Sequence, residues 1–566
     1  MIPPDPFPDF APSRFRLIRL IGSGGMGVVY EAWDKQREIR TALKVLTGLD
    51  PDALYLFKNE FRSLADMSHP NLVGLHELFF EQGKWFFTME FVEGGHFLEV
   101  VRPDSPAHTA SFAEKITLGP NEPTLTGQFV EVSPIAGPET SAFGGFQESM
   151  LRSALGQLMQ AVQALHDAGI LHRDLKPANV KIAPDGRVVI LDFGLAAHRD
   201  HAWFQETTAE GGLFGTVSYI SPEQAKGFRV KEAADWYAVG VMLFEALTGR
   251  RPFEGAAAQI LHDKQRHEAP PAEKFAIDIP EDLRAISAGL LARHPDQRMT
   301  GKRALELLRC EGPPRTGMAA RPPQPGGAAA FVGREPQLAI LRAAFAATES
   351  GAPCTAFVHG KSGIGKSALV EKFLLGLGAR PDVVILAGRC YEQESMAYKA
   401  LDSAMDALAR YLAKLPRHEA AELMPRDAAV LPQIFPVLRR VDAIALAPQR
   451  AGLMMDQYDL RRNAFAALRE LLSRLGDRRQ VILCIDDLQW GDADSASLLR
   501  EVLRGPEAPR LMLIGSYRDG YEDRSAFLQL MATEAFGDFS LARYDLPLGP
   551  LTKEECRTLA TRLAGT

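Results

Sequence analysis

Short apolar stretches and amphipathic patterns alternate along most of the chain. Residues 16–21 have the extended pattern of a β-strand, and the apolar run 355–359 leads through glycines into the helical segment 368–375. One set of apolar residues recurs at the spacing of an amphipathic helix: Leu54, Phe57, Phe61 and Leu64. This alternation predicts a multidomain protein that combines the α+β and α/β fold classes.

Two stretches interrupt the pattern. Residues 310–330 are rich in proline, glycine and alanine and contain almost no large apolar residue, so we predict a linker there. Residues 103–145 are rich in proline, serine, threonine and glycine and are predicted to be a surface insertion. We therefore expect an N-terminal tail over 1–14 and two folded bodies over 15–309 and 331–566.

Composition and charge narrow the class of protein. Of the 566 residues, 46% are hydrophobic and 24% charged, as in folded proteins, and the formal net charge of −7 gives no reason to expect a nucleic-acid partner. No apolar run approaches the ~18–20 residues of a membrane-spanning helix. The five cysteines are scattered without a C-x-x-C pair, which argues against disulfides or zinc. We expect a cytoplasmic protein without membrane insertion.

A glycine-rich segment, G-S-G-G-M-G at 22–27, follows the first predicted strand. Glycine lets the backbone approach phosphate groups closely, but this spacing also fits a dinucleotide site. A dinucleotide loop opens a helix, whereas here β-branched residues continue as a second strand, which favours ATP. Lys44, at the end of the next strand, is a candidate for the α- and β-phosphates, and Glu60 on the helical stripe could pair with it.

The segment H-R-D-L-K-P-A-N-V at 172–180, followed by D-F-G at 192–194, carries the most specific chemistry in the first half. Asp174 can orient a hydroxyl and accept its proton, and Asn179 and Asp192 supply hard oxygen ligands for Mg²⁺. The ordered set predicts transfer of the γ-phosphoryl group of ATP to a hydroxyl.

With these residues the first half resembles the bacterial eukaryotic-like Ser/Thr protein kinases. The resemblance implies a bilobal fold with ATP between the lobes, and Lys176 matches the Ser/Thr class, in which it contacts the γ-phosphate. It also implies an activation segment that is ordered by phosphorylation, for which Thr207 and Thr208 are candidate acceptors. The residues that it places around ATP are Gly22, Ser23, Gly24, Gly25, Met26, Gly27, Val29, Ala42, Lys44, Met89 and Glu90.

The same resemblance assigns structural roles to residues of the large lobe. Asp235 is expected to brace the catalytic loop, and Arg298 to pair with Glu223. Val217 stands where many relatives have proline, which could loosen the peptide-docking loop. The insertion at 103–145 is longer than usual for these kinases, and we expect a passive loop rather than a docking element.

The second half contains a complete G-x-x-x-x-G-K-S segment at 360–367, with an apolar strand before it and an apolar helix after it. This context predicts a P-loop NTPase with an α/β sandwich fold. The loop amides, with glycines at Gly360, Gly363 and Gly365, would cradle phosphates. Lys366 would reach the β- and γ-phosphates, and Ser367 would coordinate Mg²⁺.

A second apolar strand ends in Asp486 and Asp487, which we expect to contact Mg²⁺ and to position the attacking water. Together with the segments 331–335 and 486–492, these residues resemble the regulatory AAA-type ATPases of the STAND class. The strand 511–518 then matches sensor 1, with Arg518 as its polar residue. Because the chain ends within a predicted amphipathic helix and has no sensor-2 segment, we expect a piece of a longer protein.

Three functions fit these motifs. The first is a Ser/Thr protein kinase in intracellular signalling, acting on proteins and on itself, whose activity a fused ATP-binding module regulates. The alternative is a nucleotide-switched scaffold with a weak or inactive kinase, and the third is an NTPase that assembles partners. The complete set of catalytic residues argues for the first. ATP hydrolysis by the second half, and an oligomer that depends on nucleotide, stay open.

Overall fold

The computed structural model describes residues 10–24, 27–47, 50–65, 67–103, 145–192, 217–228, 230–276, 278–308, 331–349, 351, 353–378, 380–448, 457–504, 508–532 and 542–564. Contacts between residues divide the chain into two compact units. Unit 1 comprises 1–47, 59–76 and 86–324, and unit 2 comprises 48–58, 77–85 and 325–566. Within the described residues, no helix combines the length and apolar character needed to cross a membrane.

The first half of the chain begins with an antiparallel sheet in which the strands follow the order β1-β2-β3-β5-β4. These strands are β1 (Phe15–Gly24), β2 (Gly27–Asp34), β3 (Ile39–Leu46), β4 (Leu75–Glu81) and β5 (Lys84–Glu90). The predicted strand at 16–21 lies within β1, and the predicted amphipathic stripe lies on helix α1 (Pro51–Leu64), where its four apolar residues are all buried.

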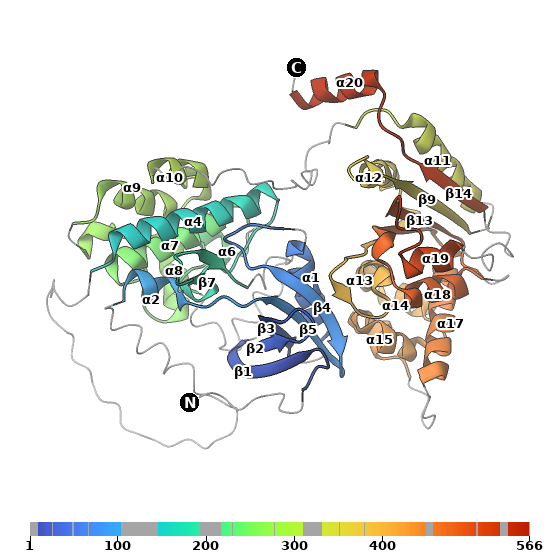
Figure 1. Ribbon diagram of the computed structural model, residues 1–566, viewed down its shortest axis with the longest axis horizontal. Helices are drawn as coiled ribbons and strands as arrows, with labels where there is room; N and C mark the ends of the chain where they lie inside the picture. The colour runs from blue at the N-terminus through green and yellow to red at the C-terminus, as the bar shows by residue number, and fades with distance from the viewer. Residues whose placement is uncertain are drawn as a thin grey trace. The chain divides into compact units, whose positions relative to one another are not determined.

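The rest of unit 1 is mainly helical (Figure 1). Its helices are α2 (Phe97–Val101), α4 (Glu148–Asp167), α6 (Pro222–Ala225), α7 (Ala233–Thr248), α8 (Ala257–Arg266), α9 (Glu281–Leu290) and α10 (Gly301–Leu307). A small sheet consists of β6 (Gly95–His96), β7 (Val180–Ile182) and β8 (Val188–Ile190). Asp192 lies just after β8. Helix α7 is buried along most of its length and ends at Gly249, whose φ of 73° suits glycine.

The second half contains a parallel sheet in the order β10-β12-β13-β9-β14, as expected for a P-loop protein. Its strands are β9 (Cys354–Gly360), β10 (Val383–Arg389), β12 (Gln480–Asp486), β13 (Leu511–Arg518) and β14 (Ala542–Pro547). The predicted α/β fold is therefore confirmed. The carboxyl ends of these strands lie at one edge of the sheet, where ligands bind in parallel α/β sheets.

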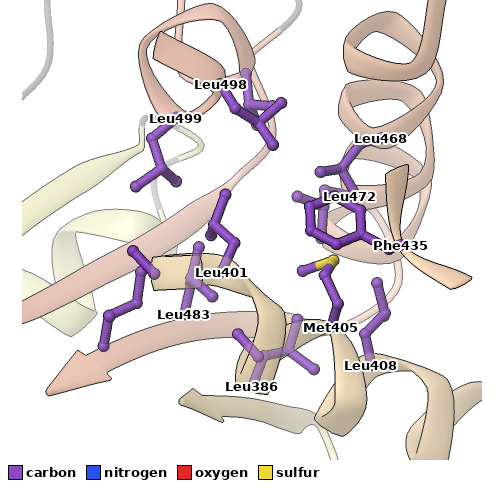
Figure 2. Packing of buried hydrophobic residues seen from close by; sticks show 14 of the residues in the cluster. Leu386, Leu401, Met405, Leu408, Phe435, Leu468, Leu472, Leu483, Leu498 and Leu499 are labelled. Carbon is purple, nitrogen blue, oxygen red and sulfur yellow. The ribbon is translucent and has the colours of Figure 1, made fainter. Parts of the chain in front are cut away.

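Helices cover both faces of this sheet. The longer helices of the second half are α11 (Glu335–Glu349), α12 (Lys366–Leu377), α13 (Lys399–Lys414), α17 (Gln457–Gly476), α18 (Ala493–Val502) and α20 (Lys553–Ala564). The shorter elements are β11 (Glu394–Ser395), α14 (Arg417–Leu423), α15 (Leu431–Ile434), α16 (Asp442–Ala445) and α19 (Ala526–Ala532). Figure 2 shows one core, in which leucines and Met405 of α13 meet residues of α17, α18, β10 and β12. A separate core packs α11 and α12 against the sheet.

Candidate functional site

Three charged side chains that the sequence singled out meet in unit 1. Lys44 on β3 places its Nζ 2.7 and 3.0 Å from the two carboxylate oxygens of Glu60 on α1. The same Nζ lies 2.7 Å from Oδ1 of Asp192, which follows β8. Lys44 and Glu60 are buried, whereas the side chain of Asp192 is 48% exposed. One ammonium group therefore joins the sheet, the helix and the loop that carries Asp192.

Burial and charge act in opposite directions on these groups. Burial alone would lower the pKa of Lys44, but the charges of Asp192 and Glu60 raise it above its usual value. Burial raises the pKa of Glu60 to about 7 against the opposing charge of Lys44. Burial would also raise the pKa of Asp192, but Lys44 holds it well below its usual range. Asp192 is therefore a carboxylate at neutral pH, the form that Mg²⁺ requires.

The catalytic loop gathers Asp174, Lys176 and Asn179. Lys176 Nζ donates to Oδ2 of Asp174 at 2.8 Å, and the amide nitrogen of Asn179 donates to the same oxygen at 3.1 Å and to the Asp174 carbonyl at 2.9 Å. Among the residues that the structure describes, none donates a hydrogen bond to the buried Oδ1 of Asp174. One oxygen of this carboxylate is thus held by two donors, whereas the other has no hydrogen-bond donor among the described residues.

Asp235 at the start of α7 fixes the backbone of this loop. Its Oδ1 accepts from the amide of Arg173 at 2.8 Å, and its Oδ2 accepts from the amide of His172 at 2.9 Å and lies 2.8 Å from Nε2 of His166. Burial alone would raise the pKa of Asp235, but the hydrogen bond from His166 and the nearby charges lower it. These bonds stabilise a positive φ of 66° at Arg173, just before Asp174. Asp235 thus takes up the bracing position that the sequence predicts.

The other predicted pair of the large lobe also forms. The guanidinium of Arg298, which is fully buried, contacts Glu223 on α6 at 2.7 and 3.0 Å. A bidentate pair of this kind fixes both the distance and the orientation of its partners. It anchors the start of α6, whose N-cap Ser221 follows the segment 217–220.

Most of the residues predicted around ATP lie on the first sheet. Gly22, Ser23 and Gly24 of β1 pair with Val29, Val28 and Gly27 of β2 in a hairpin. At Gly27, an added Cβ would lie 2.4 Å from the carbonyl oxygen of Val45, so no side chain fits there.

Ala42 pairs with Met89 across β3 and β5, and Glu90 follows Met89 with its carboxylate in contact with Arg187. Contact of these residues with ATP stays a prediction. The predicted residues Gly25, Met26, Thr207 and Thr208 lie outside the described residues, as does nearly all of the predicted insertion.

In unit 2, the predicted P-loop connects β9 to α12. Gly360, Gly363 and Gly365 all have positive φ, as the tight turn requires. Lys366 Nζ donates to the carbonyls of Gly360 and Lys361 at 3.0 and 3.1 Å, so the lysine is folded onto its own loop. Burial lowers the pKa of Lys366. The loop therefore presents backbone amides at the start of a helix, the arrangement that binds phosphates.

The two predicted aspartates lie at the end of β12. Asp486 Oδ2 accepts from the hydroxyl of Ser367 at 2.8 Å, which brings together the two residues predicted to hold Mg²⁺. Asp487 instead has both oxygens engaged: Arg389 Nε and Nη2 donate to Oδ2 at 2.9 and 2.8 Å, and Gln489 donates to Oδ1 at 2.9 Å. Both oxygens of Asp487 are thus hydrogen-bonded to neighbouring side chains, and its role in positioning a water molecule stays a prediction.

Sequence reasoning missed Arg389, Gln489 and Ser516, which contact the two aspartates. Arg389 is the last residue of β10 and lies beside Asp486 in the register of the parallel pair. That adjacency depends on the strand order, which the motifs do not contain. The predicted sensor residue Arg518 ends β13, and its backbone amide donates to Gln489 at 3.2 Å.

Comparison with known proteins matches both halves of the chain. Residues 15–119 and 136–308 match the model of the protein kinase domain, and residues 330–514 match that of the AAA ATPase domain. The chain thus contains both domains, and its predicted resemblance to protein kinases and AAA-type ATPases is confirmed. Membership of the STAND class stays a prediction.

Among curated proteins, the chain is similar to the serine/threonine-protein kinase PknA of Mycobacterium tuberculosis (strain ATCC 25618 / H37Rv). The two are 33% identical over 328 residues, which cover 55% of this chain and 63% of PknA. Serine/threonine-protein kinase PrkC of Bacillus subtilis (strain 168) is 29% identical over 289 residues, 50% of this chain and 38% of PrkC. AtPK1/AtPK6 of Arabidopsis thaliana is 28% identical over 289 residues, 50% of this chain and 52% of that kinase. The chain covers less than two thirds of each relative.

The raised pKa of Glu60 predicts a pH effect on phosphoryl transfer. Because the pKa is about 7, the carboxylate that pairs with Lys44 is lost as the pH falls through this value. We expect kcat/KM to fall between about pH 8 and about pH 6, and Glu60→Gln to lower kcat/KM by about tenfold at pH 8 and to flatten this limb. Steady-state rates across this range check the expectation. If kcat/KM of Glu60→Gln falls as steeply with decreasing pH as that of the wild type, the pH effect belongs to another group.

Proposed function

Since the chain carries a protein kinase domain followed by an AAA ATPase domain, we propose that it is an ATP- and Mg²⁺-dependent serine/threonine protein kinase regulated by its own ATPase domain. The observation that carries the proposal is the carboxylate of Asp174: Lys176 and Asn179 hold one oxygen, and no described residue donates a hydrogen bond to the other. This arrangement suits a group that accepts a proton from a substrate hydroxyl. The proposed substrates are cytoplasmic proteins with Ser or Thr side chains, including the chain itself.

The proposed reaction is an in-line phosphoryl transfer. The substrate hydroxyl donates its hydrogen bond to the carboxylate of Asp174 while its oxygen attacks the γ-phosphorus. The bond between the γ-phosphorus and the bridging oxygen breaks, ADP leaves, and Asp174 takes up the proton. Lys176, 2.8 Å from Asp174, lies where its charge can stabilise the transferred group.

The residues present fit a bound magnesium ion. Asp192 is ionised and half-exposed, and Asn179 donates its amide nitrogen to Asp174, which leaves its oxygen as the atom to face a cation. Mg²⁺ held there would neutralise charge on the phosphates. Lys44, held by Glu60, would then orient the α- and β-phosphates.

The ATPase domain supplies a second nucleotide site in this proposal. Its loop amides and Lys366 would bind phosphates, and Ser367 and Asp486, already 2.8 Å apart, would hold Mg²⁺. Because Arg389 and Gln489 hydrogen-bond to the carboxylate of Asp487, we expect the site to retain bound ATP and to hydrolyse it slowly. Slow turnover suits a module whose bound nucleotide sets the state of the kinase. A nucleotide-dependent oligomer is a further expectation for this domain.

The kinase proposal predicts that Asp174→Asn lowers phosphate transfer by about 10²-fold or more, because an amide cannot accept the hydroxyl proton. The measurement is transfer of label from γ-labelled ATP to a generic basic protein by the full chain. Asp167→Asn, at an exposed acid on α4, is the matched control and should keep the wild-type rate. Equal labelling by the wild type and Asp174→Asn would disprove kinase activity and favour the scaffold.

For the second site we predict that one substitution removes ATP binding and that another raises ATP hydrolysis. Lys366→Ala should remove ATP binding at the P-loop, because the lysine is the cation that reaches the phosphates. Arg389→Met should release Asp487 and raise ATP hydrolysis by about tenfold with little change in ATP affinity. Both are measured in the full chain that also carries Asp174→Asn, so that the kinase site adds no turnover. If Arg389→Met leaves hydrolysis unchanged, Asp487 is not restrained by Arg389.

A further inference from the structure

Lys264 on α8 is a buried cation that neither of the two sites uses. Its side chain is 1% exposed, and its Nζ donates to the carbonyl oxygens of Val217 at 2.8 Å, Ser218 at 3.1 Å and Ile220 at 2.8 Å. An ammonium group has three N–H donors, so each donor has one carbonyl partner. The three bonds join α8 to the backbone of the segment 217–220.

Among the described residues, no carboxylate pairs with Lys264. Its Nζ lies 5.7 Å from the centroid of the Tyr237 ring. Burial lowers the pKa of Lys264 to about 7, while the three carbonyls favour the protonated form. A buried charge of this kind is costly for the fold, so a core leucine or methionine would be the more stable occupant if packing were its only task.

Side chains of the segment 217–220 also form hydrogen bonds with their neighbours. The hydroxyl of Tyr219 donates to Glu245 on α7 at 2.6 Å, and Arg251 donates to the hydroxyl of Ser218 at 2.9 Å. These contacts orient individual side chains. Lys264 is the group that restrains the backbone itself, through three of the four carbonyls in the segment.

The segment lies beside the proposed proton acceptor. Tyr219, Ile220 and Gln224 line the same pocket as Arg173 and Asp174, and Gln224 donates to the carbonyl of Arg173 at 3.3 Å. Residues 219 and 220 therefore adjoin the residue that a substrate hydroxyl would approach in the proposed reaction. A change in the backbone of this segment would alter the surroundings of Asp174.

We propose that Lys264 is a positioning residue for the protein substrate, which it serves by holding the backbone of residues 217–220 in the conformation that receives the peptide next to Asp174. The inference rests on the kinase function proposed above. Proline at position 217 would restrict the backbone by fixing φ, whereas with valine there the bond from Lys264 restrains the backbone at the Val217 carbonyl.

The test compares Lys264→Met with the wild type in the full chain that also carries Lys366→Ala, so that ATP turnover comes from the kinase site alone. Methionine keeps most of the side-chain volume and removes all three donors. We expect kcat/KM for a basic protein substrate to fall by about tenfold or more. The KM for ATP and the slow transfer of the γ-phosphoryl group to water should change by less than about twofold, because neither needs a docked peptide.

Two further variants separate positioning from a general loss of structure. Lys264→Arg, which restores a cation with several donors, should recover much of the protein-directed rate, and Lys302→Met, at an exposed lysine on α10, should match the wild type. If Lys264→Met does not fold, Lys264→Gln is measured in its place, and its two amide donors should give an intermediate loss.

Equal losses in the protein-directed and water-directed rates would overturn the inference, and so would an unchanged kcat/KM for the protein substrate. A wild type that transfers no phosphate to protein would instead refute the proposed kinase function. The two failures are therefore distinguishable.

Discussion

The hydrogen bonds that Asp235 accepts from the backbone amides of His172 and Arg173 are the constraint on which the first site depends. A buried carboxylate can hold two amides only if both remain where its oxygens point, so the loop has one allowed position relative to α7. That position sets the positive φ of Arg173 and directs Asp174 toward Lys176 and Asn179. Asp174, the proposed proton acceptor, is thus placed by the helical core rather than by its own loop.

The same device recurs at other points of the kinase domain. Lys44 joins three elements through two carboxylates, Arg298 anchors the start of α6 through Glu223, and Lys264 restrains residues 217–220 through carbonyls alone. In each case a cation with several donors joins its own element to a segment that lies elsewhere in the sequence. In the ATPase domain a comparable contact joins β10 to the end of β12, since Arg389 donates to Asp487.

The sequence predicted those features whose residues are contiguous or recur at the short spacing of a strand or helix. The glycine hairpin, the catalytic loop, the P-loop and the strand ending at Asp486 were all predicted, and the Lys44–Glu60 pair followed from one strand and one helical stripe. Arg389 and Lys264 could not be found in this way. Arg389 meets an aspartate 98 positions later through strand order, and Lys264 meets carbonyls 44 to 47 positions earlier through helix packing. Neither adjacency leaves a local pattern in the sequence.

Asp235→Asn tests the central claim most directly. The amide keeps the shape of the side chain but replaces one acceptor oxygen by a donor, which then faces His166 or a backbone amide. The measurement pairs kcat for phosphate transfer to protein with the Kd of ATP at the kinase site, in the full chain that also carries Lys366→Ala. The expected result is a fall in kcat of about 10²-fold, with the Kd for ATP changed by less than about twofold. A kcat equal to that of the wild type would contradict the claim that Asp235 sets the geometry of Asp174.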